Sequence, residues 1–172
     1  VPPGFTLTTE VCAEYYGAGE KLPSGLMTQI RENLSKLEEE MEKGFGSSEN
    51  PLLVSVRSGA AVSMPGMMDT ILNLGLNDET VKALGRSMKN DRAAFDAYRR
   101  LINMFGDVVM GVGHEHFEDA FEEIKQECGA RDDIDVPLEG LQKLVEKYKA
   151  LYRKHTKEPF PQEPFKQLEM AI

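Results

Sequence analysis

From about residue 75 to its end, the sequence places apolar residues at the spacing of amphipathic α-helices and shows no pattern typical of a strand. The stripe over 91–105 is an example, because its apolar positions recur every three or four residues and so lie on one helix face. Similar stripes predict helices at about 77–86, 115–128, from 137 to the PFPQEP break, and from 164. Because such faces are buried against one another, we predict an all-helical part over 75–172.

The first part of the chain mixes helix and strand patterns. Apolar residues from Leu26 to Met41 step by four, four, three and four, which predicts an amphipathic helix over 26–43. Three shorter patterns accompany it: a half-buried strand in GFTLT, a helix in TEVCAEYY and a strand in LLVSV. We therefore predict an α+β fold that is mostly α, with an α/β part over 1–74 followed by the helical part.

Composition limits the classes of partner. The 172 residues carry 20 Lys and Arg against 29 Asp and Glu, a formal net charge of -9, whereas nucleic-acid binding needs a basic surface. No run approaches the roughly 18 apolar residues of a membrane-spanning helix. Cys12 and Cys128 lie far apart and belong to no metal-ligand motif, which favours a reducing, intracellular setting. We expect neither a nucleic-acid partner nor a membrane partner.

The stretch VSVRSGAAVSMPGMMDT, residues 54–70, carries the candidate site. Arg57 ends a predicted strand, and its forked guanidinium suits phosphate oxygens. Ser58 and Gly59 come directly after it, and small residues let backbone N–H groups approach an anion. The alternative is that Arg57 pairs with a carboxylate of this acidic chain. The local pattern alone favours that alternative, because the segment matches neither a P-loop nor GxGxxG.

The second half of the same stretch is a methionine-rich turn. Met64, Met67 and Met68 surround a Pro-Gly pair, and flexible thioethers suit either an irregular core or an adaptable binding surface. Asp69 and Thr70 can form hydrogen bonds within the turn or cap the next element of the chain. Core packing is favoured on pattern alone, and a lid or docking turn is the alternative.

The remaining clusters predict no site. His114 and His116 are two positions apart, so they do not share a helix face, and no third ligand lies nearby in the sequence. We therefore expect no metal site. Arg99 and Arg100, with Arg92 nearby, are most simply interpreted as a solvated basic face.

The run LLVSVRSGAAVSMPGMMDTILNLGLND resembles the corresponding stretch of the pyruvate, phosphate dikinase family. VPPGFTLTTEVC, AYRRLINMFGDVVMGV and EPFPQEPFKQLEMAI are also similar to that family, so the resemblance covers nearly all of the chain. The related phosphoenolpyruvate synthases share VPPGF-like and VRSSA-like pieces but are less similar across the methionine turn.

The resemblance implies that the chain is an internal piece of an ATP-grasp-like nucleotide-binding domain, which binds ATP with magnesium. The family interconverts ATP, phosphate and pyruvate with AMP, diphosphate and phosphoenolpyruvate through a phosphohistidine on another domain. It also implies that Arg57 contacts the nucleotide's phosphates and that Ser58 and Gly59 line the same site. Many members have a second arginine where this chain has Ala61, and this departure from the family pattern removes one possible phosphate contact. No magnesium ligands and no phosphorylatable histidine motif are expected within the chain.

The resemblance also carries wider expectations. We interpret both ends as cuts in a longer polypeptide, expect the piece alone to be catalytically inert, and expect the full-length enzyme to be a homodimer. Its other domains, which carry the phosphohistidine and bind pyruvate, would be its partners. The expected compartment is the cytoplasm, or a plastid or other organelle in a eukaryote. Two alternatives stay open: a phosphoenolpyruvate synthase segment, or a helical module with only a structural or interaction role.

Overall fold

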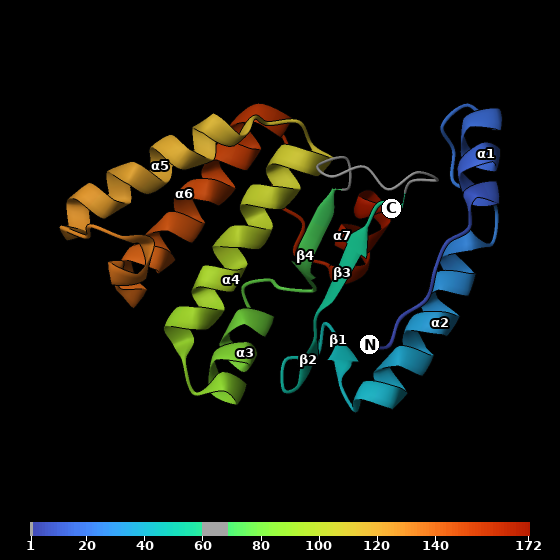
Figure 1. Ribbon diagram of the computed structural model, residues 1–172, viewed down its shortest axis with the longest axis horizontal. Coiled ribbons are helices and arrows are strands. Elements are labelled where there is room, and N and C mark those ends of the chain that lie inside the picture. The colour runs from blue at the N-terminus through green and yellow to red at the C-terminus, as the bar shows by residue number, and fades with distance from the viewer. Residues whose placement is uncertain (1, 60–68) are drawn as a thin grey trace. The chain divides into compact units, whose positions relative to one another are not determined.

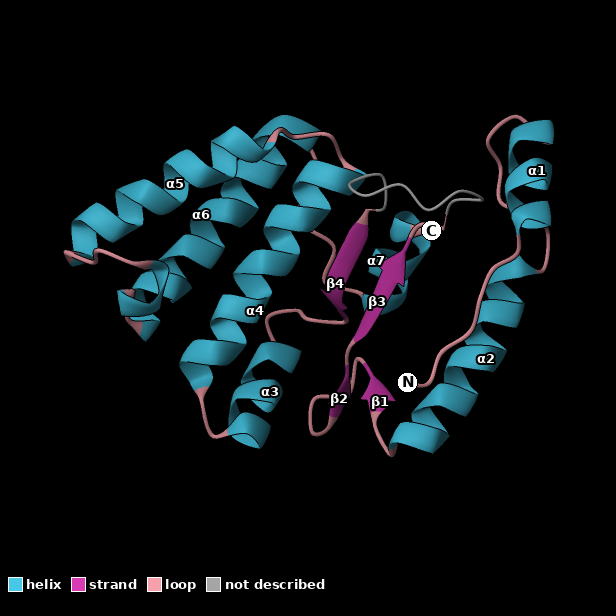
Figure 2. Cartoon of the chain, in the orientation of Figure 1, coloured by secondary structure: helices cyan, strands magenta, loops and turns pink. Residues whose placement is uncertain are grey.

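The computed structural model describes residues 2–59 and 69–172, which form two compact units, Val1–Phe45 and Gly46–Ile172. Helices dominate both units, and the strands are short (Figure 2). The predicted mostly-α, α+β fold class is confirmed. Within the described residues, no helix combines the length and apolar character needed to cross a bilayer.

The first unit contains α1 (Thr9–Gly17), α2 (Leu26–Met41) and the two-residue strand β1 (Gly44–Phe45). Helix α2 buries the first three residues of the stripe that predicted it, Leu26, Ile30 and Leu34, whereas Met41 at its end is exposed. The prediction of a strand in GFTLT is wrong, because residues 4–8 take no strand pairing and Phe5 is 43% exposed. Alternation of apolar residues specifies a strand only where another strand pairs with it and one of its faces is buried.

The strands of the second unit are β2 (Pro51–Leu52), β3 (Val54–Arg57) and β4 (Thr70–Leu74). Strands β3 and β4 pair antiparallel, with Arg57 opposite Thr70 and an irregularity between Val54 and Val56. The sequence pattern did not predict β4. Its alternation is broken at Asn73, which adopts a left-handed conformation (φ 63°) and donates a hydrogen bond from its side chain to the Ala97 carbonyl.

The helices of the second unit match the predicted stripes closely. They are α3 (Thr80–Met88), α4 (Asp91–Met104), α5 (His114–Cys128), α6 (Leu138–Thr156) and α7 (Pro164–Ala171). Helix α4 contacts α3, α6 and β4, and α5 runs beside α6 (Figure 1). A π-helical turn, η1 (Phe105–Val109), extends α4, and a 3-10 turn, η2 (Asp133–Asp135), precedes α6. Apolar spacing predicted neither turn.

A buried glutamine joins β4 to the helices. The side chain of Gln167, on α7, is fully buried and accepts a hydrogen bond from the Gly75 backbone N–H at 2.9 Å. Its amide nitrogen donates to the carbonyls of Leu76 and Pro161, both at 2.8 Å. Because a buried amide is costly unless paired, these bonds hold the end of β4 and α7 together over about 90 residues of sequence.

The core of the second unit is rich in aromatic side chains. Phe105 lies 5.6 Å from the ring of Phe160 and 6.4 Å from that of Tyr152, and Phe160 also meets Tyr98 edge-on. These residues come from α4, η1, α6 and the segment before α7. The cluster therefore fixes how the helices pack, and offset or edge-on ring pairs add to the energy of area burial.

Burial of tyrosines predicts loss of stability at alkaline pH. Burial raises the pKa of the Tyr148 phenol to about 12 from its ordinary 10.0, and burial also raises the pKa of Tyr152 to about 12. The unfolded chain then loses these protons before the folded chain does, so stability is complete below pH 10 and falls as the pH rises toward 12. We expect the free energy of unfolding to fall by about 1.4 kcal/mol per pH unit for Tyr148.

Urea unfolding at a series of pH values would measure this fall, with Tyr148→Phe as the control. The variant keeps the ring but has no phenolic proton, so its dependence on pH should be shallower. Equal slopes in both proteins between pH 10 and 12 would contradict the assignment to Tyr148.

The predicted boundary between an α/β part and a helical part stays a prediction. The last strand among the described residues ends at Leu74, and only helices come after it there, in agreement with the pattern that suggested the boundary. The compact units, however, meet between Phe45 and Gly46, so β3 and β4 belong to the same unit as the helices. Contacts of β4 with α4 and α7 account for this grouping.

Candidate phosphate-binding hairpin

The neck of the β3–β4 hairpin brings together four of the predicted site residues. Arg57 pairs with Thr70, and the next residue pair closes the neck through a hydrogen bond from the Ser58 backbone N–H to the Asp69 carbonyl at 3.0 Å. The Ser58 hydroxyl also donates to the Asp69 carbonyl, at 3.3 Å. The two ends of the intervening segment are thereby held together at a defined register.

Arg57 is exposed and lies on the side of β3 that was predicted. Val54 and Val56 are half-buried, whereas Ser55 and Arg57 are exposed, so the strand alternates as its sequence suggests. Among the described residues, no carboxylate lies within ion-pair distance of the Arg57 guanidinium, and no hydrogen bond of its side chain is found there. The alternative in which Arg57 pairs with an acid of this chain gains no support from the described residues.

The hairpin places its residues differently from a parallel sheet. Ligands gather at the carboxyl ends of parallel strands, but β3 and β4 run antiparallel. Here Arg57 lies at the neck of a hairpin. It is the last residue of β3, and its pairing with Thr70 of β4 fixes its position. Gly59, just beyond the neck, has space around it, because an added Cβ would meet nothing within 4 Å. The described residues therefore leave room for another group to approach the Gly59 backbone closely.

The structure describes only the last two residues of the methionine-rich turn. Met64, Met67 and Met68 lie outside the described residues, as does Ala61. Asp69 and Thr70 are described: Asp69 is exposed and supplies the carbonyl of the neck, and Thr70 is the first residue of β4. The sequence pattern placed both residues in the turn, so it did not predict that they help to pair β3 with β4.

A small recess lies beside the strands, away from Arg57. It has a volume of about 170 Å³ and is lined by Leu53, Val54, Ser55, Leu72 and Asn73, at the irregular part of the hairpin. Ligand pockets usually enclose about 300–1,000 Å³, so this recess alone cannot hold a nucleotide. Within the described residues, no group of three His, Cys, Asp or Glu side chains is arranged to hold a metal ion.

The histidines take part in local contacts instead. His114 lies between Asp107, at 3.8 Å, and Glu118, at 3.2 Å, at the start of α5. His116 and His155 stack across α5 and α6, with ring centroids 4.4 Å apart. Loss of hydration and the neighbouring His116 lower the pKa of His155.

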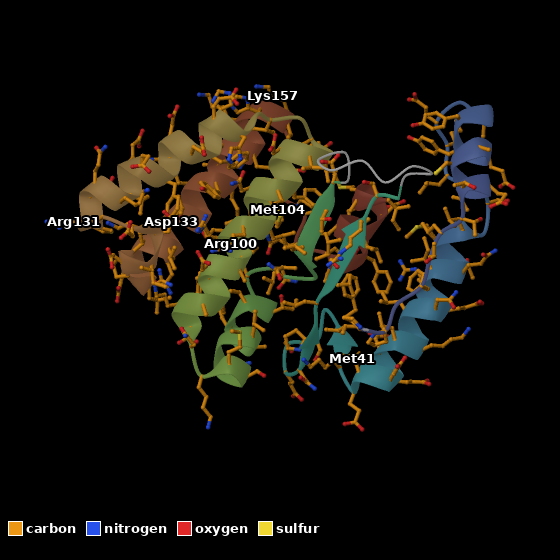
Figure 3. The ribbon with its side chains drawn as sticks, viewed as in Figure 1. Met41, Arg100, Met104, Arg131, Asp133 and Lys157 are labelled. Atoms are coloured by element: carbon orange, nitrogen blue, oxygen red, sulfur yellow. The ribbon has the colours of Figure 1, made fainter. Side chains whose placement is uncertain are left out.

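The interpretation of Arg92, Arg99 and Arg100 as one solvated face is wrong. Arg99 is only 6% exposed, forms an ion pair with Asp96 at 2.8 Å and lies 4.2 Å from the ring centre of Phe121. Arg92 donates to two backbone carbonyls. Arg100, labelled on α4 in Figure 3, is exposed and forms an ion pair with Asp96. Phe121 on α5 and Asp133 in η2 contact Arg99, and spacing on one helix could not indicate these contacts.

The chain belongs to a family of nucleotide-binding domains. Residues 19–113 match the family model for the pyruvate phosphate dikinase AMP/ATP-binding domain, and this range includes the whole β3–β4 hairpin. The family model thus covers more than half of the chain, and this match confirms the resemblance that the VRSGA and SMPGMMDT motifs suggested.

Curated relatives are pyruvate, phosphate dikinases. The chain is 49% identical to pyruvate, phosphate dikinase 1, chloroplastic, of Arabidopsis thaliana, 52% identical to the chloroplastic enzyme of Flaveria pringlei and 50% identical to the enzyme of Clostridium symbiosum. Each alignment covers 100% of this chain but only 18%, 18% and 20% of the relative. The chain therefore spans about a fifth of the length of the curated relatives that it matches.

Proposed function

We propose that this chain forms part of the nucleotide-binding domain of a pyruvate, phosphate dikinase, and that Arg57 binds the phosphates of ATP. The observation that supports this most is an exposed arginine without a described partner, at a pinned hairpin neck inside the matched family region. Such a guanidinium, on a chain of net charge -9, is a local positive site where an anion can bind.

The proposed chemistry begins with the guanidinium of Arg57. Its forked N–H donors would hold two phosphate oxygens and offset the negative charge that develops during phosphoryl transfer. Because the neck fixes the backbone on both sides of Arg57, less freedom is lost when phosphate binds. The role of the arginine is thus to position the phosphates and to neutralise their charge, and it transfers no proton.

Ser58 and Gly59 would have different roles. The Ser58 N–H already donates to Asp69, so we assign Ser58 to closing the neck and not to a direct backbone contact. Gly59, exposed and uncrowded, offers the backbone N–H that can approach a phosphate oxygen. The methionines at 64, 67 and 68 remain proposed as a lid or docking turn beside the nucleotide, together with Asp69 and Thr70 at its base.

Magnesium does not fit the described residues. The neck contributes one exposed carboxylate, Asp69, which belongs to no metal-holding group of three His, Cys, Asp or Glu side chains among the described residues. Since Mg²⁺ needs several oxygen ligands in octahedral geometry, we assign its protein ligands to the rest of a longer polypeptide. The phosphohistidine, the pyruvate site and a homodimer interface are proposed to lie there too, in an enzyme of the cytoplasm or of a plastid or other organelle.

The overall reaction can be tested with the full-length polypeptide that contains this chain. We expect it to convert ATP, phosphate and pyruvate to AMP, diphosphate and phosphoenolpyruvate, with diphosphate formed only when phosphate is supplied. The 172-residue chain is the matched control and should give no turnover. Phosphoenolpyruvate made without any diphosphate would favour a phosphoenolpyruvate synthase, and turnover by the 172-residue chain would contradict the assignment of the missing groups to other domains.

A further inference from the structure

The loop between α5 and α6 presents an isoleucine to solvent. Ile134, in η2, is 76% exposed, the highest exposure among the large apolar side chains of the described residues. The loop forms the outer end of the α5–α6 pair, where Arg131 and Asp133 are labelled (Figure 3). A single exposed apolar residue is ordinary on a protein surface, so exposure alone assigns nothing to Ile134.

What distinguishes this loop is how firmly its backbone is held. Asp132 and Asp135 form a reciprocal capping box around η2, in which the Asp132 N–H donates to Asp135 Oδ2 at 3.1 Å. From α4, Arg92 donates to the carbonyls of Asp133, at 2.7 Å, and Val136, at 2.8 Å. Hydrogen bonds on both sides of Ile134 therefore fix the direction in which its side chain leaves the loop.

The side chain of Asp133 adds contacts with α5 and with a second residue of α4. Its carboxylate lies 3.4 Å from Lys125 Nζ, on α5, and 3.6 Å from Arg99 Nη2, on α4. Arg99 is in turn buried against Phe121. Asp133 is thus bound to the helices, while its neighbour Ile134 points outward without any partner to cover it among the described residues.

We propose that residues 131–135, the η2 tip, dock on another domain of the same polypeptide by inserting Ile134 into an apolar pocket with a basic rim. This rests on the proposed membership of a longer polypeptide, and it does not depend on the nucleotide site. A preformed tip loses little conformational entropy when it binds. Burial of the isoleucine would then stabilise the docked contact by removing its side chain from water.

Charge identifies the rim of the pocket. Asp132 and Asp135 are exposed and bond to each other's backbone, and no base pairs with either carboxylate in the described residues. Two acidic groups flanking an apolar anchor fit a pocket edged by Lys or Arg, because complementary potentials favour the correct contact and disfavour others.

The small size of the tip identifies the partner as part of the same chain. Stable contacts between separate proteins bury about 1,200–2,000 Å², which one isoleucine on a short loop does not approach. Within one polypeptide the effective concentration is high, so a small contact suffices. About four-fifths of the length of the curated relatives lies outside the part that this chain matches, which leaves room for such a domain.

A photo-crosslinking residue at position 134 of the full-length polypeptide tests the proposal. A diazirine-bearing aliphatic amino acid would replace Ile134, and Gln126, exposed on α5, would carry the same group as the control. We expect crosslinks from position 134 to concentrate in one Lys- or Arg-containing peptide outside residues 1–172, with a yield independent of protein concentration. Crosslinks between isotopically light and heavy copies would instead identify a second molecule and overturn the proposal, as would scattered products matching those of position 126.

Hydrogen exchange supplies a second measurement on the same polypeptide. Ile134→Asp should increase exchange in the crosslinked peptide several-fold, whereas Ile134→Val should leave it nearly unchanged. Unchanged exchange in both variants would refute docking. Neither readout requires ATP, so a polypeptide that shows the contact but forms no phosphoenzyme would refute only the proposed nucleotide function.

Discussion

Arg57→Ala in the full-length polypeptide is expected to slow ATP-dependent formation of the phosphoenzyme by roughly 10²- to 10³-fold, the typical loss when one preorganised donor is removed from a developing negative charge. The exchange of phosphate between pyruvate and the phosphohistidine should continue at its normal rate, because it does not use the nucleotide. Rapid-quench assays of the two half-reactions would measure both rates separately.

Two variants control for a structural effect of Arg57→Ala. Ser55→Ala changes an exposed residue on the same side of β3, two positions earlier, and should leave both half-reactions unchanged. Arg57→Lys keeps the charge but loses the fork, so we expect it to recover only part of the rate. If Arg57→Ala slowed both half-reactions equally, or neither, the residue would serve the fold and not the nucleotide.

Phe105→Ala is expected to destabilise the second unit by about 3–5 kcal/mol, the usual cost of removing a fully buried phenyl ring. Phe105 is 0% exposed and meets Tyr152 and Phe160, so its loss opens a cavity between η1, α6 and the segment before α7. A lower urea midpoint with an unchanged slope would report the loss of stability.

Phe5→Ala is the matched control for this large effect. It removes the same ring from a side chain that is 43% exposed in the first unit, where surface substitutions change stability by about 0.5 kcal/mol or less. A similar loss in both variants would show that the aromatic cluster around Phe105 has no special part in stability.

The course of the chain through the second unit was predictable wherever helix periodicity is strong. Stripes over several turns, as in α4 and α6, were placed to within a few residues, because burial of one helix face needs apolar residues every three or four positions. Strands were less predictable. Strand β4 was missed because Asn73 interrupts its alternation, and GFTLT alternates without pairing.

The candidate site, too, could be predicted from the sequence only in part. The type of residue at Arg57 and its exposed side of β3 can be inferred from local sequence, because alternation along a strand is a local property. The bond from Ser58 to Asp69 cannot, because its two residues are 11 positions apart and meet only after the hairpin forms. The absence of a described acid beside Arg57 likewise depends on where every carboxylate of the unit lies.

By itself, the sequence determined the helices, the mostly-α class, the candidate arginine and, through its motifs, the pyruvate phosphate dikinase family. Only the tertiary structure decided that Arg99 is buried while Arg100 is exposed, that Gln167 joins α7 to β4, and that Ile134 leaves a firmly held loop. The physical reason is one of range. Spacing along a chain reports which side of its own element a residue faces, whereas burial and pairing depend on which other elements pack against that side.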